Sequence, residues 1–505
     1  MEVTEVPELR PTRAVLQATP QNPSRSESHL MRTASIVVAV ALAGCTASAE
    51  DVRPPQDQLA FPTGMAVTPD EKALFVVNAN SELRYDSGSI GVIDMVRVQS
   101  VVKDWVASST MPTGCDQDPD HAETLTCDEP PFFKPSSGVR VGNFATDLTV
   151  QDLTFNGAGN VRVFVPTRGD PSLAWADFDG DRLHCNATSD AYPLCDDAHR
   201  LTSLDNNPDL LPLPNEPFSV FAHTIPAFDS RGLPAPPQFG FALVTHLGTG
   251  SVTLINAPAN DDDVQISDVI NNVFAPDLVL GTGRGASSIA GLKLTTSPSV
   301  PGDPTVADEL IYVASSTEDR IQTFTVAQRN NVASYMLPGS YFFLNSVGNG
   351  AGNSVDTRGL TFSPSGDQLY LVNRMPPSVQ IYDTSIGPTG IPRNEPVGSS
   401  DVCRQASTLA VADFGTQVGN RIYVTCFQDG QVYVVDPTGQ SKVEDIISVG
   451  RGPYAAVVVS GKNPSDKPLL LVSNFLEDTI AVIDLSLDSP KRNRVVLRIG
   501  RPRTP

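Results

Sequence analysis

The sequence has 505 residues, with 35 Lys and Arg against 57 Asp and Glu, which gives a formal net charge of −22. This acidic balance argues against a protein that binds nucleic acid or anionic membrane surfaces through a positive field. Only 18% of the residues are charged, below the roughly 25% of an average soluble domain. The 43 Pro and 37 Gly residues indicate many turns between short elements. The composition therefore predicts a large folded core and not a disordered acidic chain.

The N-terminal part of the chain predicts export. Residues 34–43 (ASIVVAVALA) form an apolar run that follows Arg32 and is shorter than the roughly 20 residues of a membrane-spanning helix. A short apolar run between a basic residue and a small-residue site is typical of a secretory signal. The run ends at Gly44 and Cys45, and the string LAGC resembles the bacterial lipobox, whose cysteine becomes the acylated first residue. The alternative is that the run is a buried strand or helix of the fold.

We therefore expect three segments before the folded part. Residues 1–44 are predicted to hold an upstream extension and the lipoprotein signal peptide, with Met31 as the true start. Cys45 is the predicted lipidation site and opens a short linker over residues 45–57. This places the protein in the bacterial cell envelope, periplasmic or surface-exposed, with the membrane as its partner through the lipid at Cys45.

The other six cysteines indicate disulfides. They fall into three pairs that are close in sequence: Cys115 with Cys127, Cys185 with Cys195, and Cys403 with Cys426. An even, locally clustered set is typical of disulfides in an exported protein. For the third pair, two buried free thiols are the alternative.

An internal repeat predicts the fold. Residues 64–78 (GMAVTPDEKALFVVN) and 359–373 (GLTFSPSGDQLYLVN) share a pattern of two alternating strands around a turn, closed by an Asn that we call the anchor. A third strand ends ten residues after the anchor in six copies, and sixteen residues after it in the first copy. The seven anchors are Asn78, Thr167, His246, Ser315, Asn373, Cys426 and Asn474. Such units predict an all-β, seven-bladed β-propeller over residues 58–505.

A fourth strand per unit and several insertions complete this prediction. The expected fourth strands lie at residues 98–102, 332–337, 446–449 and 495–499. The anchors are 89 residues apart at the start of the chain and 48 apart at its end, whereas such a blade needs about 40 to 45 residues. The largest insertions, residues 104–138 and 178–217, hold the first two cysteine pairs. We expect these disulfide-pinned loops to cap one mouth of the ring and to bind a protein or glycan ligand.

The repeat resembles the YVTN-type β-propeller family. The matching second strands are LFVVN, LYLVN, IYVTC and LLVSN, and the third strands that follow them are IGVID, VQIYD, VYVVD and IAVID. The resemblance implies a propeller scaffold. Propellers of this family resemble lactonase-like hydrolases and the propeller domains of copper and quinone redox proteins, so the resemblance also implies an enzyme as an alternative function.

Chemical motifs are sparse in this sequence. Asp177, Asp179 and Asp181 alternate as in a calcium loop, although the repeat alone explains an Asp at position 177. His246 occupies an anchor position, and His223 lies upstream of it. Both are candidates for facing the channel, and the alternative is that they are ordinary polar residues of the strands. No catalytic residue is assigned and no cofactor other than calcium is expected.

Two function hypotheses follow. The first is a lipid-anchored envelope protein with a binding or scaffolding role and an unknown ligand. The second is an extracytoplasmic enzyme, a lactonase-like hydrolase or a metal-dependent redox protein, with its site at the channel mouth.

Overall fold

The computed structural model describes residues 52–156, 159–188, 190–202, 211–225, 227–228, 234–235, 239–259, 263–274, 285–292, 309–327, 335–344, 356–388, 391–439 and 441–503. The predicted signal peptide and Cys45 lie outside these residues.

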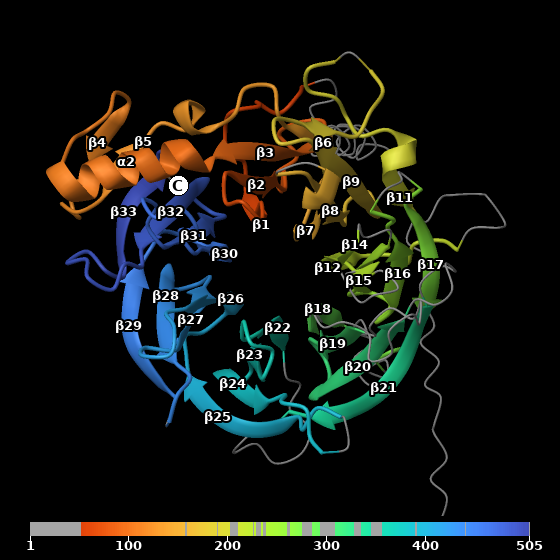
Figure 1. Ribbon diagram of the computed structural model, residues 1–505. Coiled ribbons are helices and arrows are strands. Elements are labelled where there is room, and N and C mark those ends of the chain that lie inside the picture. Colours follow the sequence, from red (N-terminus) through yellow and green to blue (C-terminus); the bar gives the residue numbers. More distant parts are fainter. Residues whose placement is uncertain are drawn as a thin grey trace, which may run out of the picture. The chain divides into compact units, whose positions relative to one another are not determined.

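Seven sheets, antiparallel except for one strand pair in the last of them, surround a central channel and confirm the predicted propeller (Figure 1). Blade 1 contains β1 (Pro62–Val67), β2 (Ala73–Asn78), β3 (Gly88–Asp94) and β6 (Val139–Val141). Blade 2 contains β7 (Thr149–Asp152), β8 (Val161–Thr167) and β9 (Ser172–Phe178), with β10 (Leu183–His184) and β11 (Arg200–Thr202) both paired to β9. Blade 3 contains β12 (Pro217–Thr224), β15 (Gly240–His246), β16 (Val252–Asn256) and β17 (Gln265–Ile270). Blade 4 contains β18 (Ala286–Leu292), β19 (Glu309–Ser315), β20 (Arg320–Ala327) and β21 (Tyr335–Phe343).

The remaining blades come from the C-terminal part of the chain. Blade 5 contains β22 (Thr357–Phe362), β23 (Gln368–Arg374), β24 (Pro377–Asp383) and β25 (Glu395–Asp401). Blade 6 contains β26 (Ala406–Asp413), β27 (Asn420–Cys426), β28 (Gln431–Asp436) and β29 (Lys442–Ser448). Blade 7 contains β30 (Pro453–Val459), β31 (Leu469–Asn474), β32 (Thr479–Asp484) and β33 (Arg494–Ile499), followed by β5 (Leu125–Cys127) and β4 (Cys115–Gln117). A separate hairpin joins β13 (Ala227–Phe228) and β14 (Pro234–Ala235), and three short 3-10 helices lie at Pro130–Phe132, Thr154–Asn156 and Asp197–His199.

The middle strands are buried on both faces, which explains the low content of charged residues. Every residue of β2 is buried. Leu74 and Val76 pack with blade 7, whereas Phe75 and Val77 pack with blade 2. Because successive side chains of a strand point to opposite faces, each blade contributes to two hydrophobic layers.

The anchor residues hold the ends of neighbouring strands together. The Asn78 amide accepts a hydrogen bond from Ala60 N (2.9 Å) and donates one to Ser89 Oγ (3.1 Å). The Asn474 amide donates to Thr479 Oγ1 and Val449 O, both at 3.0 Å. The anchor side chains therefore satisfy polar groups within the blades.

The expected fourth strand at residues 98–102 is wrong, because this segment lies in the α-helix α2 (Met95–Ser108). Asp94 caps the helix by accepting hydrogen bonds from two backbone amides of its first turn. Val98, Val102 and Trp105 are buried along one helical face. The fourth strand of blade 1 is β6 instead. The fourth strands expected at 446–449 and 495–499 overlap β29 and β33, and that at 332–337 overlaps β21 as far as the described residues reach.

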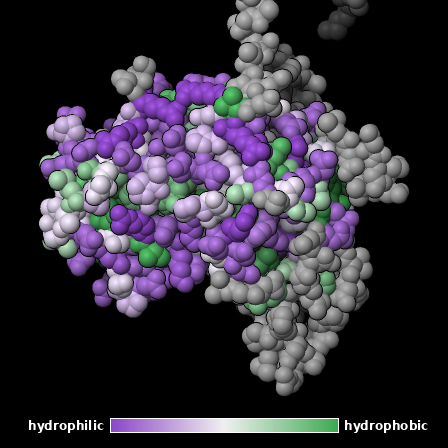
Figure 2. Space-filling model, turned by 90° about the horizontal axis from the view of Figure 1, so that it is seen from above, coloured by the Kyte–Doolittle hydropathy of each residue, from purple (hydrophilic) through white to green (hydrophobic). Residues whose placement is uncertain are grey.

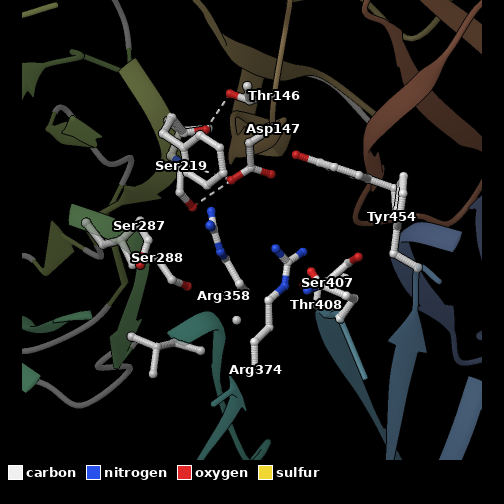
Figure 3. A pocket seen from close by; sticks show the side chains of 17 residues that line it. Thr146, Asp147, Ser219, Ser287, Ser288, Arg358, Arg374, Ser407, Thr408 and Tyr454 are labelled. Atoms are coloured by element: carbon white, nitrogen blue, oxygen red, sulfur yellow. Dashed lines mark hydrogen bonds between the residues drawn. The ribbon is translucent and has the colours of Figure 1, made fainter. Parts of the chain in front are cut away.

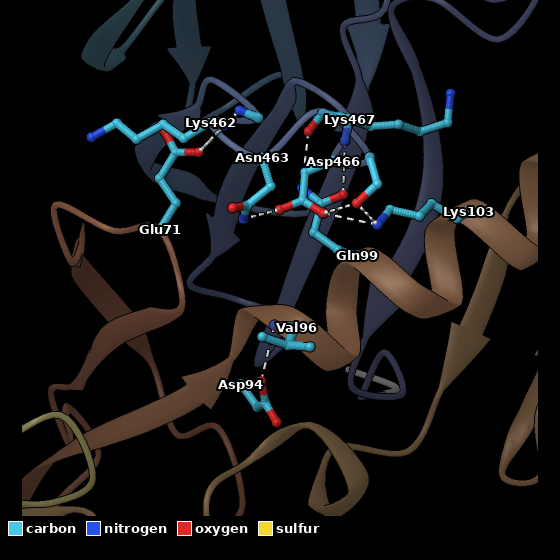
Figure 4. Close-up of polar contacts among 11 residues, drawn as sticks. Glu71, Asp94, Val96, Gln99, Lys103, Lys462, Asn463, Asp466 and Lys467 are labelled. Carbon is cyan, nitrogen blue, oxygen red and sulfur yellow. Dashed lines mark hydrogen bonds and ion pairs between the residues drawn. The ribbon is translucent and has the colours of Figure 1, made fainter. Parts of the chain in front are cut away.

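The ring closes between blade 1 and blade 7, and the four strands β30 to β33 of blade 7 all come from the C-terminal part of the chain. The insertion after β3 crosses to blade 7, where β5 pairs in parallel with β33. The side chain of Gln99 on α2 exchanges two hydrogen bonds with the backbone of Lys467 (2.9 and 3.0 Å), and Lys103 Nζ lies 2.8 Å from Asp466 Oδ1. Glu71 accepts hydrogen bonds from the loop that follows β30 (Figure 4).

All three predicted disulfides are formed, at Cys115–Cys127, Cys185–Cys195 and Cys403–Cys426. The predicted cap over the channel mouth is wrong for the first two. The Cys115–Cys127 hairpin extends the outer edge of blade 7 (Figure 1), and the Cys185–Cys195 loop follows β10, which pairs with β9 at the outer edge of blade 2. These insertions have free sheet edges to pair with, so they lie at the perimeter of the ring.

No helix within the described ranges is long and apolar enough to cross a membrane. Seen from above the view of Figure 1, the described surface is mostly hydrophilic, with apolar residues in small groups (Figure 2).

Candidate functional site

A cavity of about 480 Å³ lies in the central channel, next to the anchor ends of the blades. Its walls come from six of the seven blades. It is lined by Thr146, Asp147, Phe218, Ser219, Val220, Ser287, Ser288, Ile289, Arg358, Gly359, Leu360, Arg374, Gln405, Ser407, Thr408, Phe427 and Tyr454.

Six of these residues occupy the same position in six blades. In each blade the anchor pairs with a residue at the start of the innermost strand, or just before it in blade 2. The next residue in each blade lines the cavity: Thr146, Phe218, Ser287, Arg358, Ser407 and Tyr454. In blades 3 to 7 the register shifts directly after the anchor pair. Such irregularities re-aim side chains out of the alternating pattern, and here they turn one residue per blade toward the channel.

Two arginines of blade 5 point into this cavity (Figure 3). Arg358 lies in the irregular part of β22, and Arg374 directly follows the anchor Asn373. Both approach Asp356, with Arg358 Nε at 2.6 Å from Oδ1 and Arg374 Nη1 at 3.8 Å from Oδ2. Arg374 Nε also donates to Ala406 O at 2.7 Å, which fixes its orientation.

The two guanidinium groups carry more charge than their shared carboxylate neutralises. Burial and the neighbouring Arg358 lower the pKa of Arg374, but a guanidinium remains protonated at neutral pH. Arg358 and Arg374 together contribute two positive charges beside the carboxylate of Asp356, and the one acidic side chain among the described residues that line the cavity, Asp147, has a pKa raised by burial. The cavity therefore has a local cationic centre in a protein whose net charge is −22.

Asp147 lies across the cavity from the arginines (Figure 3). Its Oδ2 accepts hydrogen bonds from Ser219 Oγ (2.8 Å) and Val220 N (3.1 Å), and its Oδ1 accepts one from Leu148 N (2.9 Å). Burial raises the pKa of Asp147 despite these bonds. Burial and the Asp147 carboxylate also raise the pKa of Tyr454, whose ring extends into the cavity.

This arrangement is suited to recognition of an anion. Arginine presents a planar fork of N–H donors that matches carboxylate and phosphate groups. The hydroxyl groups of serine and threonine add short-range donors and acceptors around the fork. One of them, the buried Oγ of Ser407, has no hydrogen-bond partner in the described part of the chain.

The calcium candidates do not gather around one point. Both carboxylate oxygens of Asp177 bind Arg162, at 2.6 and 2.8 Å. Asp179 accepts hydrogen bonds from the backbone of Asp181 and lies 2.8 Å from His184 Nε2. Over the ranges that the structure describes, no three His, Cys, Asp or Glu side chains are placed to hold a metal ion.

His223 and His246 do not line the channel cavity. His223 Nδ1 contacts Glu309 between blades 3 and 4. His246 Nε2 lies 2.9 Å from Thr253 Oγ1, and burial lowers the pKa of His246 to about 4. Its position corresponds to Asn78 and Asn474, which also bind a hydroxyl on the next strand, and this favours the alternative that His246 is an ordinary polar residue of the strand.

Arg358, Arg374, Asp147 and Tyr454 were not predicted from the sequence. A signal was present at Arg358, which directly precedes the repeated Gly359, whereas Thr63 precedes the equivalent Gly64. An arginine at this position stands out once the repeats are aligned. This arginine faces the channel because the strand register shifts between Thr357 and Gly359. The alternation of apolar and polar residues in the sequence does not reveal that shift.

No family model matches the sequence, and no curated protein matches it. Similar solved structures include the periplasmic gluconolactonase PpgL of Pseudomonas aeruginosa, with 15% identity and a TM-score of 0.42 over 78% of this chain and 87% of that one. Hydrazine synthase of Kuenenia stuttgartiensis has 12% identity and a TM-score of 0.43 over 87% and 98%. AztD of Citrobacter koseri has 10% identity and a TM-score of 0.39 over 87% of both chains. Similarities this remote do not bear on the function of this chain.

Proposed function

We propose that the protein binds a small ligand through an anionic group, a carboxylate or a phosphate, in the central channel. The observation that carries this proposal is the convergence of Arg358 and Arg374 on one cavity, with the single carboxylate of Asp356 between them. Because the protein carries a net negative charge, its remaining surface repels anions. An anion is therefore expected to bind at the arginine pair and not elsewhere on the protein.

The test is a calorimetric titration of the purified protein with inorganic phosphate, sulfate and acetate. Arg374→Gln removes one fork, and a hydrogen bond between charged groups contributes about 1.5–3 kcal/mol, so affinity should fall about ten- to hundredfold. Arg168→Gln is the matched control, because Arg168 directly follows the anchor of blade 2 but pairs with Glu216 outside the cavity. Absence of binding to every anion, or an equal loss in both variants, would overturn the proposal.

A hydrolase acting on an anionic ester or lactone is the second candidate function. It is favoured by Asp147, a carboxyl group with a raised pKa in the same cavity, since general acid–base catalysis uses groups whose pKa is moved toward the working pH. Turnover of a lactone or ester panel, reduced at least a hundredfold by Asp147→Asn, would support this function. Absence of turnover would contradict the hydrolase and leave ligand binding as the proposed function.

We also propose that the ring is held at the cell envelope by a lipid on Cys45, in the periplasm or at the surface. The support is the sequence of residues 34–45. A protein or glycan partner of the disulfide-pinned insertions would approach the perimeter of the ring, where those insertions lie. Mass spectrometry of the native N-terminus tests the anchor, and an unacylated chain that starts upstream of Cys45 would refute it.

A further inference from the structure

A second cavity, of about 340 Å³, adjoins the cationic cavity and has different chemistry. Its walls come from blades 3, 4 and 5, and none of the described residues that line it is charged. It is lined by Phe221, Ile289, Ala290, Gly291, Leu292, Leu360, Thr361, Phe362, Ser363, Pro364, Ser365 and Gly366. We call it the lower cavity.

Ile289 and Leu360 line both cavities and therefore mark the boundary between them. Along β22, Arg358 lines the cationic cavity and Phe362 lines the lower one. Four residues of strand span about 13 Å. Along the neighbouring β18, Ser288 and Leu292 show the same change from polar to apolar. The channel thus passes from a cationic end to an uncharged end, which is lined by Phe221, Leu292 and Phe362 together with three hydroxyl side chains, within about the length of a medium alkyl chain.

Two glycines make the wall of the lower cavity possible. A Cβ on Gly291 would lie 2.3 Å from the ring of Phe221, and a Cβ on Gly366 would lie 2.3 Å from Leu292 Cδ1. The aromatic ring and the leucine therefore pack directly on backbone, which keeps apolar side chains at this end of the channel.

We propose that the ligand is an amphiphilic carboxylate, whose head group binds Arg358 and Arg374 and whose alkyl chain packs on Ile289 and Leu360 and extends into the lower cavity. This inference rests on the proposed function. A free inorganic anion would leave the uncharged cavity unused, and an uncharged hydrophobic ligand would bring no anionic group to the two arginines, which share the single carboxylate of Asp356.

The test is a calorimetric series with acetate, butanoate, hexanoate and octanoate at constant pH and ionic strength, with inorganic phosphate as the reference anion. Burial of each methylene group is expected to strengthen binding about fourfold. The wild-type heat capacity change should also become more negative from acetate to octanoate, because apolar surface is buried.

The variant Thr361→Phe places a ring in the lower cavity. It should bind acetate as the wild type does and lose the gain with chain length. Thr188→Phe makes the same change on an exposed loop and should keep that gain. If Thr361→Phe fails to fold, the chain-length series and the heat capacity change of the wild type still test whether the alkyl chain is buried.

The outcomes separate the two proposals. If the anions bind but affinity and heat capacity do not change with chain length, the amphiphile inference is wrong and anion binding stands. If phosphate binds and no carboxylate does, the inference is again wrong. If no anion binds at all, the proposed function itself is wrong.

Discussion

Glu71 offers a sharp test of how the ring closes. It lies in the turn between β1 and β2, and its carboxylate accepts hydrogen bonds from Ser460 N (2.8 Å), Ser460 Oγ (2.6 Å), Gly461 N (3.0 Å) and Lys462 N (3.0 Å). Successive backbone amides that converge in this way form a binding site for a negative charge. Here the charge belongs to blade 1 and the amides belong to blade 7 (Figure 4).

Glu71→Gln keeps the shape of the side chain and removes the charge. One amide oxygen replaces two carboxylate oxygens, so about half of the four donors lose their acceptor. Hydrogen bonds to charged groups contribute about 1.5–3 kcal/mol each when buried, but water replaces part of this at an accessible site. We therefore expect the free energy of unfolding to fall by about 1–2 kcal/mol.

Denaturant unfolding measures this change, and hydrogen exchange of the amides in β1 and β30 shows whether the seam opens first. The matched control is Glu82→Gln, because Glu82 is 54% exposed and pairs with Arg84 within the same loop. That control should change stability by less than about 0.5 kcal/mol. A loss in Glu71→Gln no larger than in the control, with unchanged exchange at the seam, would refute this view of ring closure.

Two further predictions concern the same seam. Burial raises the pKa of Glu129 from 4.5 to about 7, so the folded state holds this proton more tightly than the unfolded state, and the associated stability is lost as pH rises through about 7. Between pH 5 and pH 8.5, denaturant unfolding of the wild type should lose about 1–3 kcal/mol relative to Glu129→Gln; parallel pH profiles would contradict this. The double variant Cys115→Ser and Cys127→Ser opens a loop with a sequence separation of 12, and should lower the free energy of unfolding by about 2–3 kcal/mol. Faster hydrogen exchange in β5 and β33 is expected in that variant, and unchanged exchange there would show that the hairpin does not depend on the bridge.

The architecture could be predicted because a propeller repeats its physical constraints. Each blade needs alternating apolar strands and a polar residue at the same strand end, so the spacing of Asn373 and Asp383 recurs along the chain. The helix was missed although the sequence carries its signal. Val98, Val101, Val102 and Trp105 are spaced i, i+3, i+4 and i+7, which is the pattern of an amphipathic helix. The capping bonds of Asp94 and the packing of Trp105 against blade 7 decide the outcome.

The site and the ring closure depend on contacts that local pattern does not contain. Arg358 faces the channel because the register shifts between Thr357 and Gly359, whereas strict alternation would place it between blades. The β4–β5 hairpin belongs to blade 1 in sequence, yet it pairs with β33, more than 360 residues away. Its disulfide was predictable from spacing, but its position was not.

The most direct measurement is the location of a bound anion by anomalous scattering, in a crystal of the protein soaked with selenate. Channel recognition by the arginine pair predicts a selenium peak in the central cavity, with selenate oxygens about 3 Å from the guanidinium nitrogens of both Arg358 and Arg374. Selenate at surface sites only, with the channel free of anomalous density, would contradict it.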